Sequence, residues 1–445
     1  MKRIVTLLLA AGLVMGAYTG AQAADVKVSG KWNFGFDFSS NADYSDGEDD
    51  FVATQRLRLQ LDIIASENLK GVIFFEIGNS TWGDSSHGAA LGADGKTVEV
   101  KRSYIDWTIP NSDAKVRMGI QGVTLPGGAF GSALLDDDVA ALVVSNAFSD
   151  NFALTAFWAR PFDGGYSNSG VGTNFQSESY NDEMDMFGLI APITLDGHAI
   201  TPYFVYASVG EDVLYDGYTS EINNNGNIRF ALTEDLDIYY FGVAYSMTAF
   251  DPFTLDVSFL YGNADNDDID QSGWMVDFKA AYALDFMTPA IIGWYASGAD
   301  SKGDGVLPTF AAGAWYPTSF GYVGSCYRMD TNTSESPEGT WAIGLELADI
   351  SFIEDLTHVF RFVYSEATND SDAADYTFSS YGDAGAPVMM RGDDSSIEIN
   401  FDSTYQIYEN LAFIVELGMI DYNIEGTSEY DETAYKATFN FVYSF

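Results

Sequence analysis

Apolar and polar residues alternate along most of the chain, and the first clear example lies between Val26 and Phe38. The even positions of this stretch hold Val, Val, Gly, Trp, Phe, Phe and Phe, while most odd positions hold Lys, Ser, Asn or Asp. A period of two predicts a β-strand with one apolar and one polar face. The pattern recurs as far as the last residues, Tyr435 to Phe445, and helical spacing is almost absent, so we expect an all-β fold.

The alternation predicts 18 strands. They cover residues 26–38, 52–65, 70–79, 98–109, 115–121, 138–146, 152–160, 185–193, 199–208, 236–249, 253–262, 272–284, 288–297, 339–352, 357–367, 395–408, 411–422 and 431–445. Sixteen strands are the alternative, because segments such as Met186 to Pro192 carry little pattern. Either number predicts an antiparallel barrel with an aqueous lumen.

The connections between these strands alternate in length. Short polar turns lie at residues 66–70, 110–114, 251–252, 354–355 and 409–410, and long acidic loops lie at 39–50, 81–97, 163–183, 298–338 and 368–394. Outer-membrane barrels have short periplasmic turns and long extracellular loops. A string of β-sandwich domains would not separate loop lengths so regularly, and its outward faces would be polar. The sequence therefore predicts one transmembrane β-barrel over residues 24–445.

The first 23 residues have the features of a secretory signal peptide. Lys2 and Arg3 precede an apolar stretch, and Ala21-Gln22-Ala23 forms a small-x-small cleavage site. The apolar stretch from Ile4 to Ala17 is shorter than the roughly 20 residues that a spanning helix needs. We therefore expect residues 1–23 to direct export.

The chain is strongly acidic, with 20 Lys and Arg against 65 Asp and Glu and a formal charge of −45. This charge excludes nucleic acid as a partner. A single cysteine, Cys326, excludes an internal disulfide. The surplus acid lies mainly in the long loops, where it would attract cations and share divalent ions with anionic lipopolysaccharide.

One acidic loop is a candidate for calcium binding. Asp265, Asp267 and Asp268 resemble the start of a calcium loop, but the glycine and distal glutamate of an EF-hand are missing. Solvated loop charge is the alternative. No other cofactor is expected.

Catalytic chemistry has little support in the sequence. The chain has three histidines, His87, His198 and His358, which is too few for a multi-histidine metal site. Asp84-Ser85-Ser86-His87 contains the residue types of a hydrolytic triad, but adjacent loop residues rarely present a nucleophile, base and orienting acid correctly. We predict no enzyme activity.

Several stretches resemble a Gram-negative outer-membrane general porin, and most of all the acidic homotrimeric porins of sulfate-reducing bacteria. They are the aromatic ending "FNFVYSF", the first strand after the signal, and "KVRMGIQ" running into "GVTLPGGAFGSALLDDDVAALVV". The resemblance implies an outer-membrane homotrimer that lets ions and small hydrophilic solutes diffuse passively. It also implies that residues 122–138 fold into the lumen as a constriction loop, and that the assembly machinery reads the last strand. The chain departs from sixteen-strand porins in its length and in the long insertion at 298–338.

On neighbouring strands, basic residues occupy the positions that alternate with the apolar ones and are therefore expected to face the lumen; we call these positions the lumen phase. A cation at the lipid midplane costs about 2–4 kcal/mol, whereas a cation in the lumen costs little. These residues form what we call the basic wall: Lys31, Arg56, Arg58, Arg102, Arg117 and Lys436. Opposite it, Asp136, Asp137 and Asp138 of the constriction loop would set up a transverse field across a narrow opening. Alternatively, each cation pairs with a neighbour such as Glu76 or Asp106.

Two other barrel functions remain open. A selective channel of the maltoporin type would need an aromatic track in its lumen. The lumen phase of the regular strands is expected to be mostly small and polar, but "AWYPTSFGYVG" at 314–324 could fold inward and supply a track. A structural or adhesive barrel would instead have a filled lumen.

Overall fold

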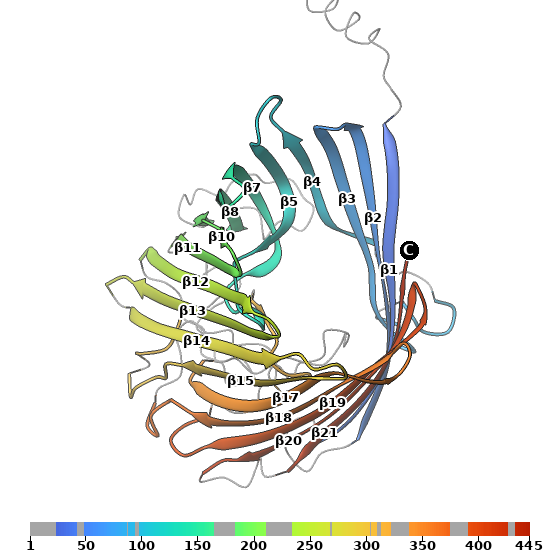
Figure 1. Ribbon diagram of the computed structural model, residues 1–445, viewed down its shortest axis with the longest axis vertical. Helices are drawn as coiled ribbons and strands as arrows, with labels where there is room; N and C mark the ends of the chain where they lie inside the picture. The colour runs from blue at the N-terminus through green and yellow to red at the C-terminus, as the bar shows by residue number, and fades with distance from the viewer. Residues whose placement is uncertain are drawn as a thin grey trace, which may run out of the picture.

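The chain forms a closed antiparallel β-barrel, seen in a computed structural model (Figure 1). The structure describes residues 24–41, 49–86, 88–93, 98–163, 183–210, 234–267, 269–302, 304–308, 313–321, 338–373, 390–425 and 432–445. In these ranges no helix is long and apolar enough to cross a bilayer.

The barrel has eighteen strands, as the alternation predicts, so the alternative of sixteen is wrong. The first half of the ring comprises β1 (Asp25–Ser40), β2 (Asp50–Ser66), β3 (Leu69–Thr81), β4 (Val98–Thr108), β5 (Lys115–Thr124), β7 (Asp136–Ser149), β8 (Phe152–Asp163), β9 (Glu183–Ile190) with β10 (Ile193–Leu195), and β11 (His198–Val209). The second half comprises β12 (Leu236–Phe250), β13 (Phe253–Asp265), β14 (Asp270–Tyr282), β15 (Thr288–Ala296), β17 (Thr340–Ile353), β18 (Leu356–Ala367), β19 (Ser395–Tyr408), β20 (Leu411–Asn423) and β21 (Ala434–Ser444).

Two features complicate this strand order. β9 and β10 occupy one position in the ring, because Pro192 has no N–H to donate and interrupts the strand between them. β6 (Gly131–Ser132) and β16 (Ala314–Trp315) lie outside the ring, where they form a separate two-stranded sheet.

The barrel closes where the last strand meets the first. β21 pairs with β1 from Lys31 opposite Ser444 to Ser40 opposite Tyr435, and the C-terminus lies beside β1 in Figure 1. The backbone of Phe445 continues this pairing, since its carbonyl accepts from Gly30 N at 2.9 Å and its amide donates to Gly30 O at 3.0 Å. Closure removes the free edges that an open sheet would expose.

The two faces of each strand differ in burial. On β1, Asn33 and Asp37 are buried on the inner face, while Trp32 and Phe38 are exposed on the outer face. Outward aromatic rings gather near both ends of the barrel: Trp274 stacks on Tyr295 towards the loop end, and Trp32 stacks on Tyr443 towards the turn end. An apolar belt between two aromatic girdles is the exterior of a membrane barrel.

The long and short connections lie at opposite ends of the barrel. Two-residue links such as 67–68, 150–151 and 354–355 join strands at one end, and the long connections that follow β3, β5 and β15 begin at the other end. At the loop end the link 266–269 between β13 and β14 is short. Loop lengths thus segregate as the sequence predicts.

Candidate pore constriction

Gly119 directs one hairpin out of the barrel wall. Its φ is 126°, and a Cβ on it would lie 2.3 Å from the carbonyl oxygen of Ser103 on β4. The β4–β5 ladder ends one residue later, at Ile120 opposite Ser103, whereas the β5–β7 ladder continues to Thr124 opposite Asp136. The free part of this hairpin crosses the lumen, because a Cβ on Gly128 at its tip would lie 2.4 Å from Asp277 Oδ1 on β14. We call residues 120–140 the constriction hairpin.

The hairpin tip has its own hydrophobic contacts inside the barrel. Leu125 and Leu134 are fully buried, and they belong to one cluster with inward residues of β9 to β15 such as Met186, Tyr240 and Ile292. The expectation that the lumen phase is mostly small and polar is wrong for these strands. Apolar residues are tolerated there because the hairpin tip shields them from water.

A second piece of chain, residues 313–321, also lies inside the barrel; we call it the lumen segment. Together the constriction hairpin and the lumen segment form an inner layer against the barrel wall. Its Trp315 pairs through the backbone with Gly131 of the hairpin, and the indole packs edge-on against Phe130 and Trp294. The indole Nε1 donates to Asp277 Oδ2 at 3.1 Å, and Ser258 Oγ donates to the same oxygen at 2.6 Å. One buried carboxylate on β14 therefore holds the lumen segment where the hairpin tip touches the wall.

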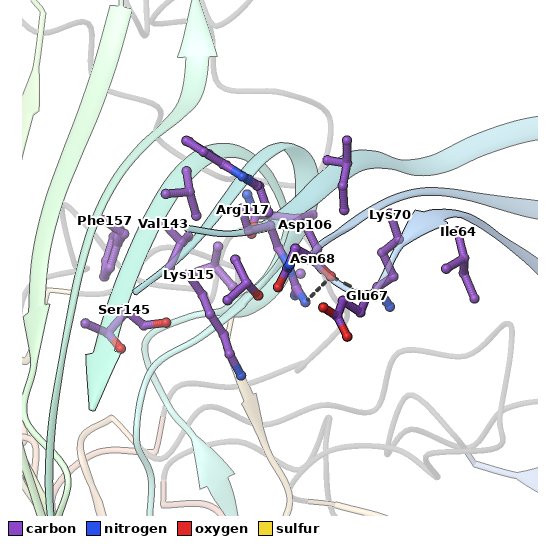
Figure 2. Close-up of a pocket in the computed structure, with 18 of the residues that line it drawn as sticks. Ile64, Glu67, Asn68, Lys70, Asp106, Lys115, Arg117, Val143, Ser145 and Phe157 are labelled. Atoms are coloured by element: carbon purple, nitrogen blue, oxygen red, sulfur yellow. Dashed lines mark hydrogen bonds and ion pairs between the residues drawn. The ribbon is translucent and has the colours of Figure 1, made fainter. Parts of the chain in front are cut away.

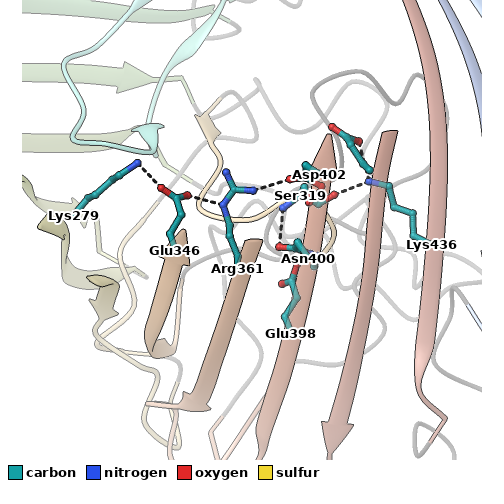
Figure 3. Close-up of polar contacts among 10 residues, drawn as sticks. Lys279, Ser319, Glu346, Arg361, Glu398, Asn400, Asp402 and Lys436 are labelled. Atoms are coloured by element: carbon teal, nitrogen blue, oxygen red, sulfur yellow. Dashed lines mark hydrogen bonds and ion pairs between the residues drawn. The ribbon is translucent and has the colours of Figure 1, made fainter. Parts of the chain in front are cut away.

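The lumen segment then runs along the wall as far as β21 (Figure 3). Ser319 Oγ donates to Asp402 Oδ1 at 2.9 Å, and Gly321 N donates to Glu398 Oε1 at 3.1 Å. Lys436 Nζ donates to the carbonyl of Ser319 at 2.6 Å. Lys436 thus points inward, but its side chain is 1% exposed because the lumen segment covers it.

The aromatic residues of the lumen segment do not form a track. Trp315 and Phe320 are 3% and 0% exposed because they pack against the wall, while Tyr316 is exposed. A row of ring faces open to solutes, which a maltoporin-type channel would use, is not present in the described residues 313–321.

A line of ion pairs fastens the strands beneath the lumen segment (Figure 3). Glu346 on β17 accepts from Lys279 Nζ at 2.6 Å and from Arg361 Nε at 2.7 Å, and Arg361 also donates to Asp402 Oδ2 at 2.7 Å. Each buried carboxylate here has a cation beside it, which offsets the cost of its desolvation.

The arginines of the basic wall lie on the other side of the lumen from the lumen segment, and Arg58 and Arg117 each sit close to a carboxylate. Arg58 Nε is 2.6 Å from Glu76 Oε2, and Arg117 contacts both oxygens of Asp106, through Nε at 2.5 Å and through its Nη2 at 3.1 Å. These arginine side chains stay about one-third to two-fifths exposed, at 34% and 41%. They are paired and still face water.

The remaining members of the wall differ in their surroundings. Lys31 lies opposite Arg58 in the β1–β2 ladder. Arg56 makes no ion pair with any side chain in the described ranges, although Glu76 is near enough to interact through space. The sequence allowed two interpretations of these cations, a continuous basic surface or separate ion pairs. Each interpretation describes part of this surface.

Asp138 pairs with β4 rather than facing it across an opening. Its carboxylate binds Lys101 Nζ at 2.9 Å and also Arg102 Nε. Both cations reach it because β4 has a bulge, with Arg102 opposite Phe74 but Val100 opposite Phe75. Lys101 is the residue that sequence reasoning missed, since strict alternation assigns it to the outer face. A bulge leaves no signal in the alternation.

Asp136 and Asp137 are exposed at the start of β7, where the sequence predicts a loop. Asp136 Oδ1 accepts from Thr124 Oγ1 at 2.6 Å, and Asp137 Oδ1 accepts from the backbone N of Asp138 at 2.7 Å. Of the range 122–138, residues 122–124 belong to β5 and residues 136–138 to β7, and residues 125–135, which include β6, connect the two strands.

A cavity of about 630 Å³ lies in the lumen between the hairpin and the turn end of the barrel (Figure 2). Its polar lining includes Lys70, Asp106, Lys115 and Arg117, and Phe157 contributes an apolar side. Lys70 Nζ is 3.5 Å from Asp62 and 3.7 Å from Asp106, so charges of opposite sign alternate along this part of the wall.

The other candidates from the sequence are not assembled into sites. Asp265 and Asp267 are exposed, and Asp268 lies outside the described residues. The described part of the chain contains no group of three His, Cys, Asp or Glu side chains arranged to hold a metal. Asp84 Oδ1 accepts from the N and Oγ of Ser86, both at 2.7 Å, which closes a local turn, and His87 lies outside the described residues.

Comparison with known proteins supports the fold. No protein-family model and no curated protein matches the chain. Among solved structures, Pseudomonas aeruginosa OpdQ matches with a TM-score of 0.55 and 12% identity, over 95% of this chain and 98% of OpdQ. OpdO matches at 0.56 and 12%, over 95% and 97%, and OccK8 (OprE) at 0.54 and 10%, over 95% and 98%. These proteins are outer-membrane porins, and the chain shares their fold.

Proposed function

We propose that this chain is a porin of the Gram-negative outer membrane, which lets ions and small hydrophilic solutes diffuse through a water-filled channel. The observation that carries the proposal is the charged, partly exposed wall of β2 to β5 beside a lumen cavity of about 630 Å³. Eighteen strands enclose more space than side chains alone fill. The shared fold with outer-membrane porins agrees with this function.

The inner layer explains how the channel is narrowed to one side. The constriction hairpin and the lumen segment lie against β8 to β21, where they cover apolar and ion-paired residues. Solutes would then pass along the opposite wall, between Arg58, Arg117 and the carboxylates beside them. Fixed charges of both signs favour polar solutes over apolar ones, and arginine remains charged when it is partly desolvated.

Several further assignments belong to this proposal. Residues 1–23 would be a signal peptide, which lies outside the described residues, and 24–445 the mature barrel in the outer membrane. We propose 122–138 as the constriction, a homotrimeric assembly, contact with lipopolysaccharide and outer-membrane lipid, and recognition of the last strand by the assembly machinery. The acid surplus and the aromatic ending favour the porins of sulfate-reducing bacteria as relatives.

A substrate-selective channel is the second candidate, and the lumen segment favours it. An inner layer that covers much of the wall leaves a smaller and more asymmetric passage than one hairpin would.

Single-channel recording in planar bilayers tests both candidates. The general porin predicts large ohmic current steps that sugars, amino acids and small carboxylates do not block. Saturable block by one of these classes would favour the selective channel. Absence of conductance from a correctly folded barrel would contradict both and indicate a structural barrel with a closed lumen.

A further inference from the structure

A ring of oxygen-bearing side chains surrounds Gly35 on the inner face of the barrel seam. In the antiparallel ladders Gly35 lies between Thr54 of β2 and Asn440 of β21. Asn33 and Asp37 are its inward neighbours along β1. Gly35 has no side chain, so the centre of this ring is left open.

The oxygens point into that space. A Cβ on Gly35 would lie 3.1 Å from Asn440 Oδ1, 3.1 Å from Thr54 Oγ1 and 3.6 Å from Asp37 Oδ2. The first two strands and the last strand of the barrel therefore each direct one oxygen at the same point. Thr438, opposite Asp37 in the ladder, adds a further hydroxyl beside it.

Three of these residues, Asn440, Thr54 and Thr438, have buried polar atoms without a hydrogen-bond partner in the described part of the chain. Asn440 and Thr54 are 0% exposed. Within the described chain, neither polar atom of Asn440, nor Thr54 Oγ1, nor Thr438 Oγ1 has a hydrogen-bond partner. A buried polar atom without a partner costs about 1–3 kcal/mol. Several such atoms around one space therefore indicate that an ion or a water molecule occupies it.

We propose that the space over Gly35 is a binding site for Ca²⁺. The donors are one carboxylate, amide carbonyl oxygens and hydroxyls, with no nitrogen or sulfur ligand, and this set suits a hard cation. A water ligand on the ion would accept from Asn440 Nδ2. Because the ligands come from the first, second and last strands, the site exists only in the closed barrel, and the ion stabilises that closure.

Affinity is expected in the range of extracellular calcium modules, with a Kd on the order of 10⁻⁴–10⁻³ M, since the ring supplies a single carboxylate. This site is separate from the acidic loops and does not depend on the chain being a channel.

The direct test is a Tb³⁺ soak of crystals of the folded full barrel, since Tb³⁺ replaces Ca²⁺ and scatters anomalously. The expected result is an anomalous peak bounded by Asp37, Thr54 and Asn440. Water density without an anomalous peak at that position would overturn the proposal.

Calcium titration by calorimetry gives the solution test, with folding checked by the heat-dependent gel mobility of the barrel. Gly35→Ala places a methyl in the ring, and Asp37→Asn removes its charge, so each should weaken the site by about tenfold or more. Thr54→Val keeps the shape and should also weaken it. Gly71→Ala, where a Cβ meets nothing within 4 Å, and the double variant Asp265→Asn, Asp267→Asn should retain it. Equal calcium binding in all variants would overturn the proposal.

Discussion

Single residues decide where the inner layer lies, and Gly119 is the clearest example. Its backbone conformation and its contact with Ser103 leave no room for a side chain. At the other end of the hairpin, Asp277 is 1% exposed and gathers Ser258, Trp315 and the hairpin tip around one carboxylate. A bend and an anchor together fix the constriction hairpin across the lumen.

Replacing Gly119 with Ala should disturb this bend. The φ of 126° and the 2.3 Å approach to Ser103 O make any side chain strained, at a cost of about 1–3 kcal/mol. We expect lower resistance to urea and a changed single-channel conductance. Gly71→Ala is the control, since a Cβ there meets nothing within 4 Å. Wild-type stability and conductance in the Gly119 variant would contradict the assigned bend.

Removing the anchor should loosen the hairpin. Asp277→Ala leaves the Trp315 N–H and the Ser258 hydroxyl without their acceptor, which costs about 1–3 kcal/mol per buried group. Single-channel traces should become noisier and the mean conductance should rise, because the tip is no longer fixed. Asp256→Ala, an inward carboxylate on β13, is the matched control. Quiet, wild-type steps from the Asp277 variant would show that the tip is held elsewhere.

At the scale of the elements, two features bring Lys101, Arg102 and Asp138 together beside the hairpin. One is the bulge in β4, and the other is the separation of β5 from β4 beyond Ile120. The bulge in β4 turns Lys101 and Arg102 towards the same carboxylate, Asp138. The side chains bridge the place where β5 leaves β4. The bulge in β4 thus provides ion pairs where the backbone pairing between β4 and β5 has ended.

The charge of Asp138 should affect ion preference. Asp138→Asn would leave Lys101 and Arg102 without their counter-charge, and the two cations would then act on passing ions. We expect the reversal potential in a KCl gradient to shift towards anion selectivity. The control, Asp163→Asn, removes a carboxylate paired with Arg160 on β8. An unchanged reversal potential in Asp138→Asn would remove this cluster from the ion path.

At the scale of the whole molecule, the lumen has two unlike halves. Inward residues of β9 to β15 are apolar and covered, while those of β1 to β5 include paired charges that remain partly exposed. The barrel is closed between these halves by β1 and β21, where the terminal residue itself takes part in the ladder.

Deleting Phe445 should therefore impair closure. The deletion removes two backbone hydrogen bonds to Gly30, worth about 1 kcal/mol each, and a ring that packs 5.8 Å from Trp32. Refolding into detergent, followed by heat-dependent gel mobility, should give a smaller folded fraction and a lower melting temperature. Phe445→Tyr keeps the ring and backbone and should fold normally. Equal folding of the deletion would contradict a role for this residue in closure.

The sequence by itself determined the strands, because side chains along a strand alternate between the lipid face and the lumen face, and over much of the barrel these faces differ in polarity. It identified the inward phase of Lys31, Arg58 and Lys436 and the opposite ends for turns and loops. Tertiary structure decided which inward residues meet water. Lys436 is covered, Met186 and Tyr240 face a lumen that is locally apolar, and Lys101 joins the charged surface through a bulge. These outcomes depend on a local bulge and on contacts between segments far apart in the chain. The alternation of apolar and polar residues does not predict either of them.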